Sequence, residues 1–123
     1  MRRRQYPTQT YRQPRQVLRA AAIYARAAGT SQGRPAGLEA QEVRCQREAS
    51  RRGLVVTKVY RDTGSGLRLE RPGLDALRAA VRAGEVRAIL IDSPARLSDT
   101  DDYAALLAEW EQAGATLIVA GEG

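Results

Sequence analysis

The fold of this chain is decided by the stretch Ile23-Tyr24-Ala25-Arg26-Ala27-Ala28 and by the residues just before it. Residues 19–27 form a short apolar run, which predicts a buried strand. Arg26 lies at the end of this run, where the chain passes into a loop. The stretch therefore predicts a core strand that carries a charged side chain to the edge of a sheet.

Helix and strand patterns alternate along the rest of the chain. Apolar spacing predicts helices over 38–52, 72–83 and 99–113, and strands over 54–60, 86–91 and 115–120. Gly53, Gly84 and Gly114 follow the three helices as stop signals, and Pro72 suits the first position of the second helix. Three such alternations favour a parallel sheet with right-handed crossovers. We expect an α/β fold over 19–123, with a four-stranded, mainly parallel sheet and helices on both faces.

Ligands of such a sheet bind beyond the carboxyl ends of its strands. The loops that leave those ends are expected at 28–37, 61–71 and 92–98. Any functional site should lie in these three loops.

Further motifs fall in or beside the same loops, and they are listed in chain order: Gln32, Leu38-Glu39-Ala40-Gln41, Arg71-Pro72-Gly73 and Ala95-Arg96-Leu97-Ser98. Together with Tyr24 and Arg26 they make residues 20–123 resemble the catalytic domain of serine site-specific recombinases, the resolvase/invertase family. The resemblance implies a resolvase-like fold and DNA strand cleavage and rejoining by a nucleophilic serine, without a cofactor. It also implies that the chain is truncated before the long dimerisation helix of that family.

Four positions keep the residue that the family has. The resemblance implies that Arg26, Arg71 and Arg96 contact the scissile phosphate, for which a planar guanidinium is well suited. It places Gln41 near the catalytic site, although a satisfied buried amide explains this glutamine equally well. The segment Asp62-Thr63-Gly64-Ser65-Gly66 resembles a family loop that is one residue longer.

Three positions depart from the family. Ala28 stands where the nucleophilic serine is expected, Ala95 replaces an acid, and Asp99 replaces an arginine. A methyl group cannot bond to phosphorus. Ser31 is an alternative nucleophile, but its hydroxyl is displaced by several ångströms, since each residue advances the chain by about 3.3 Å. We therefore expect the domain to be catalytically inactive.

Acidic residues surround the start of the third helix. Ser98 is expected to cap the helix with Asp101, while Asp99 and Asp102 complement its dipole. These three acids and Asp92 could instead hold Mg²⁺. Helix-start acids usually have a capping role, so we expect no metal.

The net charge of +6 is concentrated at the N-terminus. Residues 1–19 hold six arginines and no acid, and these are Arg2, Arg3, Arg4, Arg12, Arg15 and Arg19. Residues 1–18 lack apolar periodicity and are expected to be disordered. Arginines can neutralise phosphates and tyrosines can stack on bases, so we expect this tail to bind DNA or RNA. The alternatives are a solubilising extension and a start-site artefact.

The remaining features limit the setting and the function classes. The single cysteine, Cys45, favours a reducing cytoplasm, and no apolar run reaches the roughly 20 residues of a membrane span. Three functions stay open: an inactive recombinase-like domain that binds DNA or a protein, an active recombinase with a surrogate nucleophile, and a structural adaptor. The expected partners are DNA and a second protomer, either a copy of this chain or an active recombinase.

Overall fold

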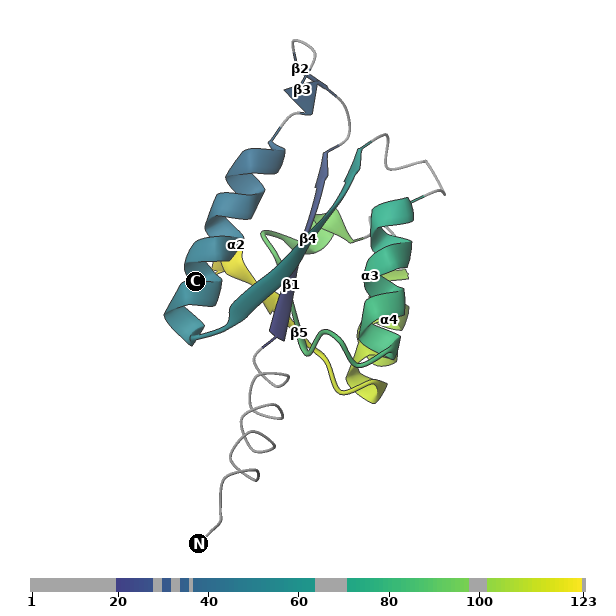
Figure 1. Cartoon of the computed structure of the whole chain (residues 1–123). Helices are drawn as coiled ribbons and strands as arrows, with labels where there is room; N and C mark the ends of the chain where they lie inside the picture. The colour runs from purple at the N-terminus through teal and green to yellow at the C-terminus, as the bar shows by residue number, and fades with distance from the viewer. Residues whose placement is uncertain are drawn as a thin grey trace, which may run out of the picture.

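The computed structural model describes residues 20–27, 30–31, 34–35, 37–63, 71–97 and 102–122 (Figure 1). Its elements in chain order are β1 (Ala20–Ala27), β2 (Thr30–Ser31), β3 (Arg34–Pro35), α2 (Leu38–Arg52), β4 (Val55–Thr63), α3 (Pro72–Arg82), β5 (Ala88–Ile91), η1 (Pro94–Arg96), α4 (Asp102–Gln112), β6 (Thr116–Val119) and η2 (Ala120–Glu122). The tail expected over 1–18 lies outside the described residues.

The main sheet has four strands in the order β4-β1-β5-β6. Each neighbouring pair runs parallel, with Ile23 opposite Val59 on one side and opposite Leu90 on the other. The predicted α/β fold with a four-stranded parallel sheet is therefore confirmed.

Helices cover both faces of this sheet, with α2 on one face and α3 and α4 on the other (Figure 1). All eight residues of β1 are buried, and their side chains alternate between the two layers. Ile23 packs in one cluster with Cys45 of α2. Tyr24 packs in the other cluster with Leu77 of α3 and Trp110 of α4. The central strand can be almost wholly apolar because both of its faces are covered.

Helix boundaries follow the expected stop and start signals. Gly53 ends α2 with a φ of 72°, a left-handed conformation that glycine adopts without a steric cost. Pro72 opens α3, where its missing N–H leaves no helical bond unmade. No helix in the described part of the chain is long and apolar enough to cross a membrane.

Two local expectations were wrong. The second strand of the sheet continues to Thr63 instead of ending at Tyr60, because residues 61–63 keep their register against the end of β1. The loop expected over 28–37 contains a short antiparallel pair, in which Thr30 lies opposite Pro35. Both segments are polar, and so they lack the apolar alternation from which a strand is predicted.

Candidate functional site

The predicted site region is formed where β1, β4 and β5 end. The ends of β1 and β4 lie side by side, with Arg26 opposite Asp62 (Figure 1). The short helix η1 follows β5 and contacts β1. Parallel strands thus bring the loops expected to carry the site to one edge of the sheet.

Gln41 fastens α2 to the end of β1. Its side-chain Oε1 accepts a hydrogen bond from the Arg26 amide at 3.0 Å, and its Nε2 donates to the Arg26 carbonyl at 2.9 Å. On the β5 side, the pairing of β1 ends at Ile23. At Arg26 the side-chain amide of Gln41 therefore takes the place of a strand backbone as the hydrogen-bond partner. Gln41 is 2% exposed and fully engaged, which fits the buried-amide interpretation and gives it a role in positioning Arg26.

Asp62 lies at the centre of a buried hydrogen-bond network. Its Oδ2 accepts from the Tyr24 hydroxyl at 2.7 Å and from the Leu74 amide at 2.9 Å, and its Oδ1 accepts from the Gly73 amide at 2.7 Å. Burial raises the pKa of Tyr24, and the hydrogen bond to Asp62 raises it further, so this tyrosine stays protonated as a donor. The carboxylate of β4 thereby caps the first turn of α3, whose own N-cap residue, Arg71, makes no side-chain cap.

The motif Arg71-Pro72-Gly73 is held tightly against β4. A Cβ at position 73 would lie 2.4 Å from the carbonyl oxygen of Arg61, so only glycine fits there. Just before it, Arg71 donates from Nη1 to the carbonyl oxygen of Leu97, the residue after η1. Arg71 therefore joins the α3 layer to the segment that carries Arg96.

Asp92 binds the arginine of the third motif. Its Oδ1 lies 2.7 Å from Nε of Arg96, and its Oδ2 lies 3.3 Å from Nη2 of Arg96 and 3.1 Å from Nη1 of Arg44 on α2. Asp92 is 7% exposed, so this carboxylate is largely shielded from water. The preceding Ala95 is exposed and offers no acid to Arg96.

The arrangement around Asp92 bears on the Mg²⁺ hypothesis and on the chemistry of Cys45. Within the described ranges, no group of three or more acidic, histidine or cysteine side chains could hold a metal ion. Asp92 instead neutralises two arginines. Burial, with a further contribution from the charge of Asp92, raises the pKa of Cys45 to about 12, so its thiol is not a nucleophile at neutral pH.

The three arginines that the resemblance assigns to the scissile phosphate are partly engaged with the protein itself. Arg26 is 8% exposed, Arg71 donates to a backbone carbonyl, and Arg96 is paired with a carboxylate. A guanidinium that already binds a carboxylate must release it before it can bind a phosphate in the same way.

Several predicted site residues lie outside the described residues. These are Ala28, Gln32, Asp99, Asp101 and the six tail arginines, while Ser31 and Asp102 are placed only by their backbone. Their roles stay predictions.

Sequence reasoning missed the structural roles of Asp62, Asp92 and Arg44. Asp62 was assigned to a loop, and because it lies ten residues before Pro72, no local signal identified it as the cap of α3. Asp92 directly follows a buried strand, where a carboxylate needs a cationic partner. No local signal in the sequence identifies Arg44 as that partner.

Comparison with known proteins was made against families, curated proteins and solved structures. The profile of the family described as "Resolvase, N terminal domain" matches residues 21–123. No curated protein matched the chain.

Solved structures of serine recombinases resemble this domain. The C-terminal catalytic domain of ISC1926 TnpA, an IS607-like serine recombinase, superposes with a TM-score of 0.74 at 29% identity, over 81% of this chain and 68% of that one. The N-terminal catalytic domain of TP901-1 integrase gives 0.75 at 27% identity, over 84% and 79%. A resolvase family site-specific recombinase from Streptococcus pneumoniae, at 20% identity, shares the fold with a TM-score of 0.72, over 85% and 73%.

Proposed function

This chain belongs to the resolvase N-terminal domain family and is a serine-recombinase-like domain linked to DNA recombination, and from that premise we propose that it has lost strand cleavage and binds DNA through its arginine-rich N-terminal segment. The observation that carries the proposal is Ala28, a methyl side chain two residues after Arg26, where the resemblance places the nucleophilic serine. Without an oxygen or sulfur at this position, no covalent bond to a phosphate can form there.

Three further features of the chain support the loss of cleavage. Arg96 is paired with Asp92 at 2.7 Å, and Ala95 takes the place of the acid expected beside it. Asp99 in place of an arginine changes the local charge by two units, which disfavours a bound phosphate. Cleavage thus lacks its nucleophile and part of its electrostatic support.

The family-motif residues that lie inside the fold keep their hydrogen bonds, which argues against a decayed fold. Tyr24, Asp62 and Gly73 form one buried network that joins β1, β4 and α3. Gln41 is fully hydrogen-bonded to the end of β1. A domain that retains its framework while losing its chemistry is suited to binding.

The charge distribution supports the DNA-binding half of the proposal. The six arginines of residues 1–19 equal the net charge of +6, so the remaining residues are formally neutral. DNA affinity should then depend on the tail and should be weakly specific in sequence, because phosphate contacts carry no sequence information.

A salt series tests this dependence with the full-length chain. For six phosphate contacts, log K against log salt should fall with a slope of roughly −5. A full-length variant with all six tail arginines changed to glutamine should lose most of its affinity and most of that slope. Equal affinity and slope for the two chains would contradict binding through the tail, and a full-length chain that binds no DNA at low salt would turn the proposal toward a protein partner.

A further inference from the structure

Four arginines of α2 are exposed to solvent, and we call them the α2 arginine face: Arg44, Arg47, Arg51 and Arg52. At about 100° per residue, the first three fall within an arc of roughly 60°. All four are exposed, and Arg44, Arg51 and Arg52 have between 51% and 69% of their side chains in water. The face is thus a stripe of long cationic side chains that solvent can reach.

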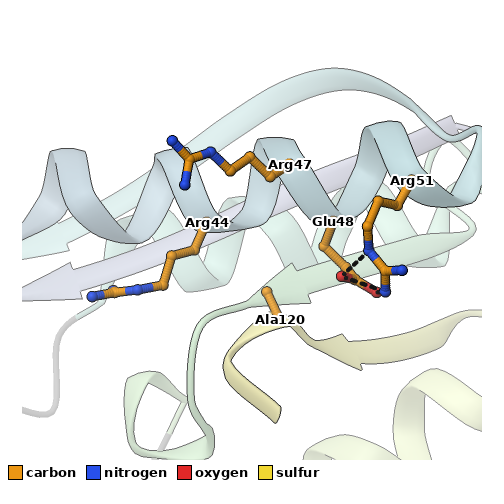
Figure 2. Close-up of a pocket in the computed structure, with 5 residues that line it drawn as sticks. All are labelled: Arg44, Arg47, Glu48, Arg51 and Ala120. Carbon is orange, nitrogen blue, oxygen red and sulfur yellow. Dashed lines mark hydrogen bonds and ion pairs between the residues drawn. The ribbon is translucent and has the colours of Figure 1, made fainter. Parts of the chain in front are cut away.

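The carboxylates near this face do not balance its charge. Glu48 pairs with both Arg51 and Arg52, and Asp92 pairs with Arg44 and Arg96. Arg47 has no ion pair within the described ranges, and Figure 2 shows its guanidinium reaching away from Ala120. Together with Arg96, the face therefore holds five arginines near two carboxylates, Glu48 and Asp92. This leaves an excess of three positive charges.

The space beside the face suits an extended anion better than a small ligand. Arg44, Arg47, Glu48, Arg51 and Ala120 line an open depression of about 330 Å³ between α2 and the start of η2 (Figure 2). Ala120 is the only apolar residue in this lining, so there is little surface on which to bury a small organic molecule. Planar guanidinium groups on flexible arms match the repeated phosphates of a nucleic-acid backbone.

The position of the face relative to the rest of the fold strengthens this match. Because α2 runs opposite to the strands, its last turn lies at the end of the sheet where β1 begins, directly after the tail arginines. Arg44 lies further towards the other end and shares Asp92 with Arg96, a residue of the candidate site. The face connects the attachment point of the tail with the carboxyl ends of the strands.

We propose that the α2 arginine face is a second DNA-binding surface, which binds the sugar–phosphate backbone of a duplex in addition to the arginine tail. This inference deepens the proposed function and rests on its DNA-binding half. Arg47 makes the principal contact, since it can bind a phosphate without giving up an existing ion pair. Arg44 donates only Nη1 to Asp92, so its remaining N–H groups can reinforce this contact while the ion pair is kept.

Full-length Arg47→Glu, with Arg82→Glu as its matched control, tests the surface. Arg82 is an exposed arginine of α3 on the opposite layer, 3.7 Å from Glu109, which keeps its bonds to Arg78. Both variants change the charge by two units at an exposed position, and a single cooperative urea transition for each would verify its folding. Binding to a random-sequence duplex is measured across a salt series for both variants and for the variant without tail arginines.

Arg47→Glu should weaken binding roughly tenfold at low salt and lower the magnitude of the salt slope by about 0.9, whereas Arg82→Glu should change the affinity less than about twofold. Equal effects of the two substitutions would overturn the second surface while leaving tail binding in place. Retained binding without the tail arginines, lost on adding Arg47→Glu, would support the surface and contradict the tail. Absence of DNA binding by the unmodified chain would overturn both and leave an acidic protein surface as the occupant.

Discussion

At the scale of single residues, the retained family motifs divide into those that build the fold and those that the resemblance assigns to phosphate. Asp62 belongs to the first group, because one buried carboxylate accepts from Tyr24, Gly73 and Leu74. Hydrogen bonds to a charged acceptor are stronger than neutral ones, and a buried donor left without a partner is costly. Asp62 therefore joins β4, β1 and α3 at one point.

Asp62→Asn tests this junction. An asparagine has a single acceptor oxygen and adds two donors, so it cannot accept all three hydrogen bonds. We expect a loss of about 2 kcal/mol or more in the free energy of unfolding. Urea denaturation measures it, with Glu111→Gln at an exposed position of α4 as the control, expected to stay within about 0.5 kcal/mol. Equal midpoints for the two variants would contradict the central role of Asp62.

Gly73→Ala tests the close approach of α3 to β4. The added Cβ would lie 2.4 Å from the carbonyl oxygen of Arg61 and 3.0 Å from Oδ1 of Asp62, so the helix start must shift. Overpacking of this kind costs about 1–3 kcal/mol. Ala79→Ser, at an exposed position of the same helix, should be nearly neutral in the same urea titration. A stable Gly73→Ala protein would show that α3 is not held against β4 as described.

At the scale of elements, the two helices on one face of the sheet, α3 and α4, are joined by an ion pair. Arg78 donates to Glu109 at 3.0 Å and 2.5 Å, and Arg78 first, with Arg82 as a smaller cause, lowers the pKa of Glu109. Since the pKa in the folded state is below the unfolded value of about 4.3, the pair stabilises the fold above that pH. Its contribution is lost as the pH falls through the lowered pKa.

Glu109→Gln should remove this contribution at neutral pH only. The side chains of Arg78 and Glu109 are 38% and 27% exposed, so solvent screening limits the effect to about 0.2–1 kcal/mol at pH 7. At pH 3 the variant and the unmodified chain should unfold at closer urea midpoints than at pH 7. A difference between the two urea midpoints that grows on acidification would contradict the lowered pKa of Glu109.

Element types were predictable because their signals are periodic and local. The first buried strand, the inward residues Leu74, Leu77 and Val81 of α3, and the glycine after each helix follow directly from sequence spacing. The end of β4 was missed because polar residues there are satisfied by partners from distant elements.

The side-chain partners of the candidate site residues were not predictable from the sequence. The parallel topology places the loops at one edge of the sheet, but the pairing of Arg96 and Arg44 with Asp92 joins segments 48 residues apart. Such a pairing depends on side-chain packing across layers, and no spacing rule in the sequence reports it.

At the scale of the whole molecule, a neutral body with an intact recombinase-type framework carries a strongly basic tail. The central claim is that this body no longer cleaves DNA. The proposed loss involves Ala28 and two further positions, Ala95 and Asp99, so restoring the serine alone should not restore cleavage.

The most direct measurement is a search for a covalent protein–DNA adduct that survives denaturation. The native chain and Ala28→Ser are incubated with fragmented DNA of the source genome, beside an active serine recombinase on its own site. We predict no adduct for either form of this chain. An adduct of the native chain would contradict the loss of cleavage, and an adduct only in Ala28→Ser would show that Ala95 and Asp99 leave a working site.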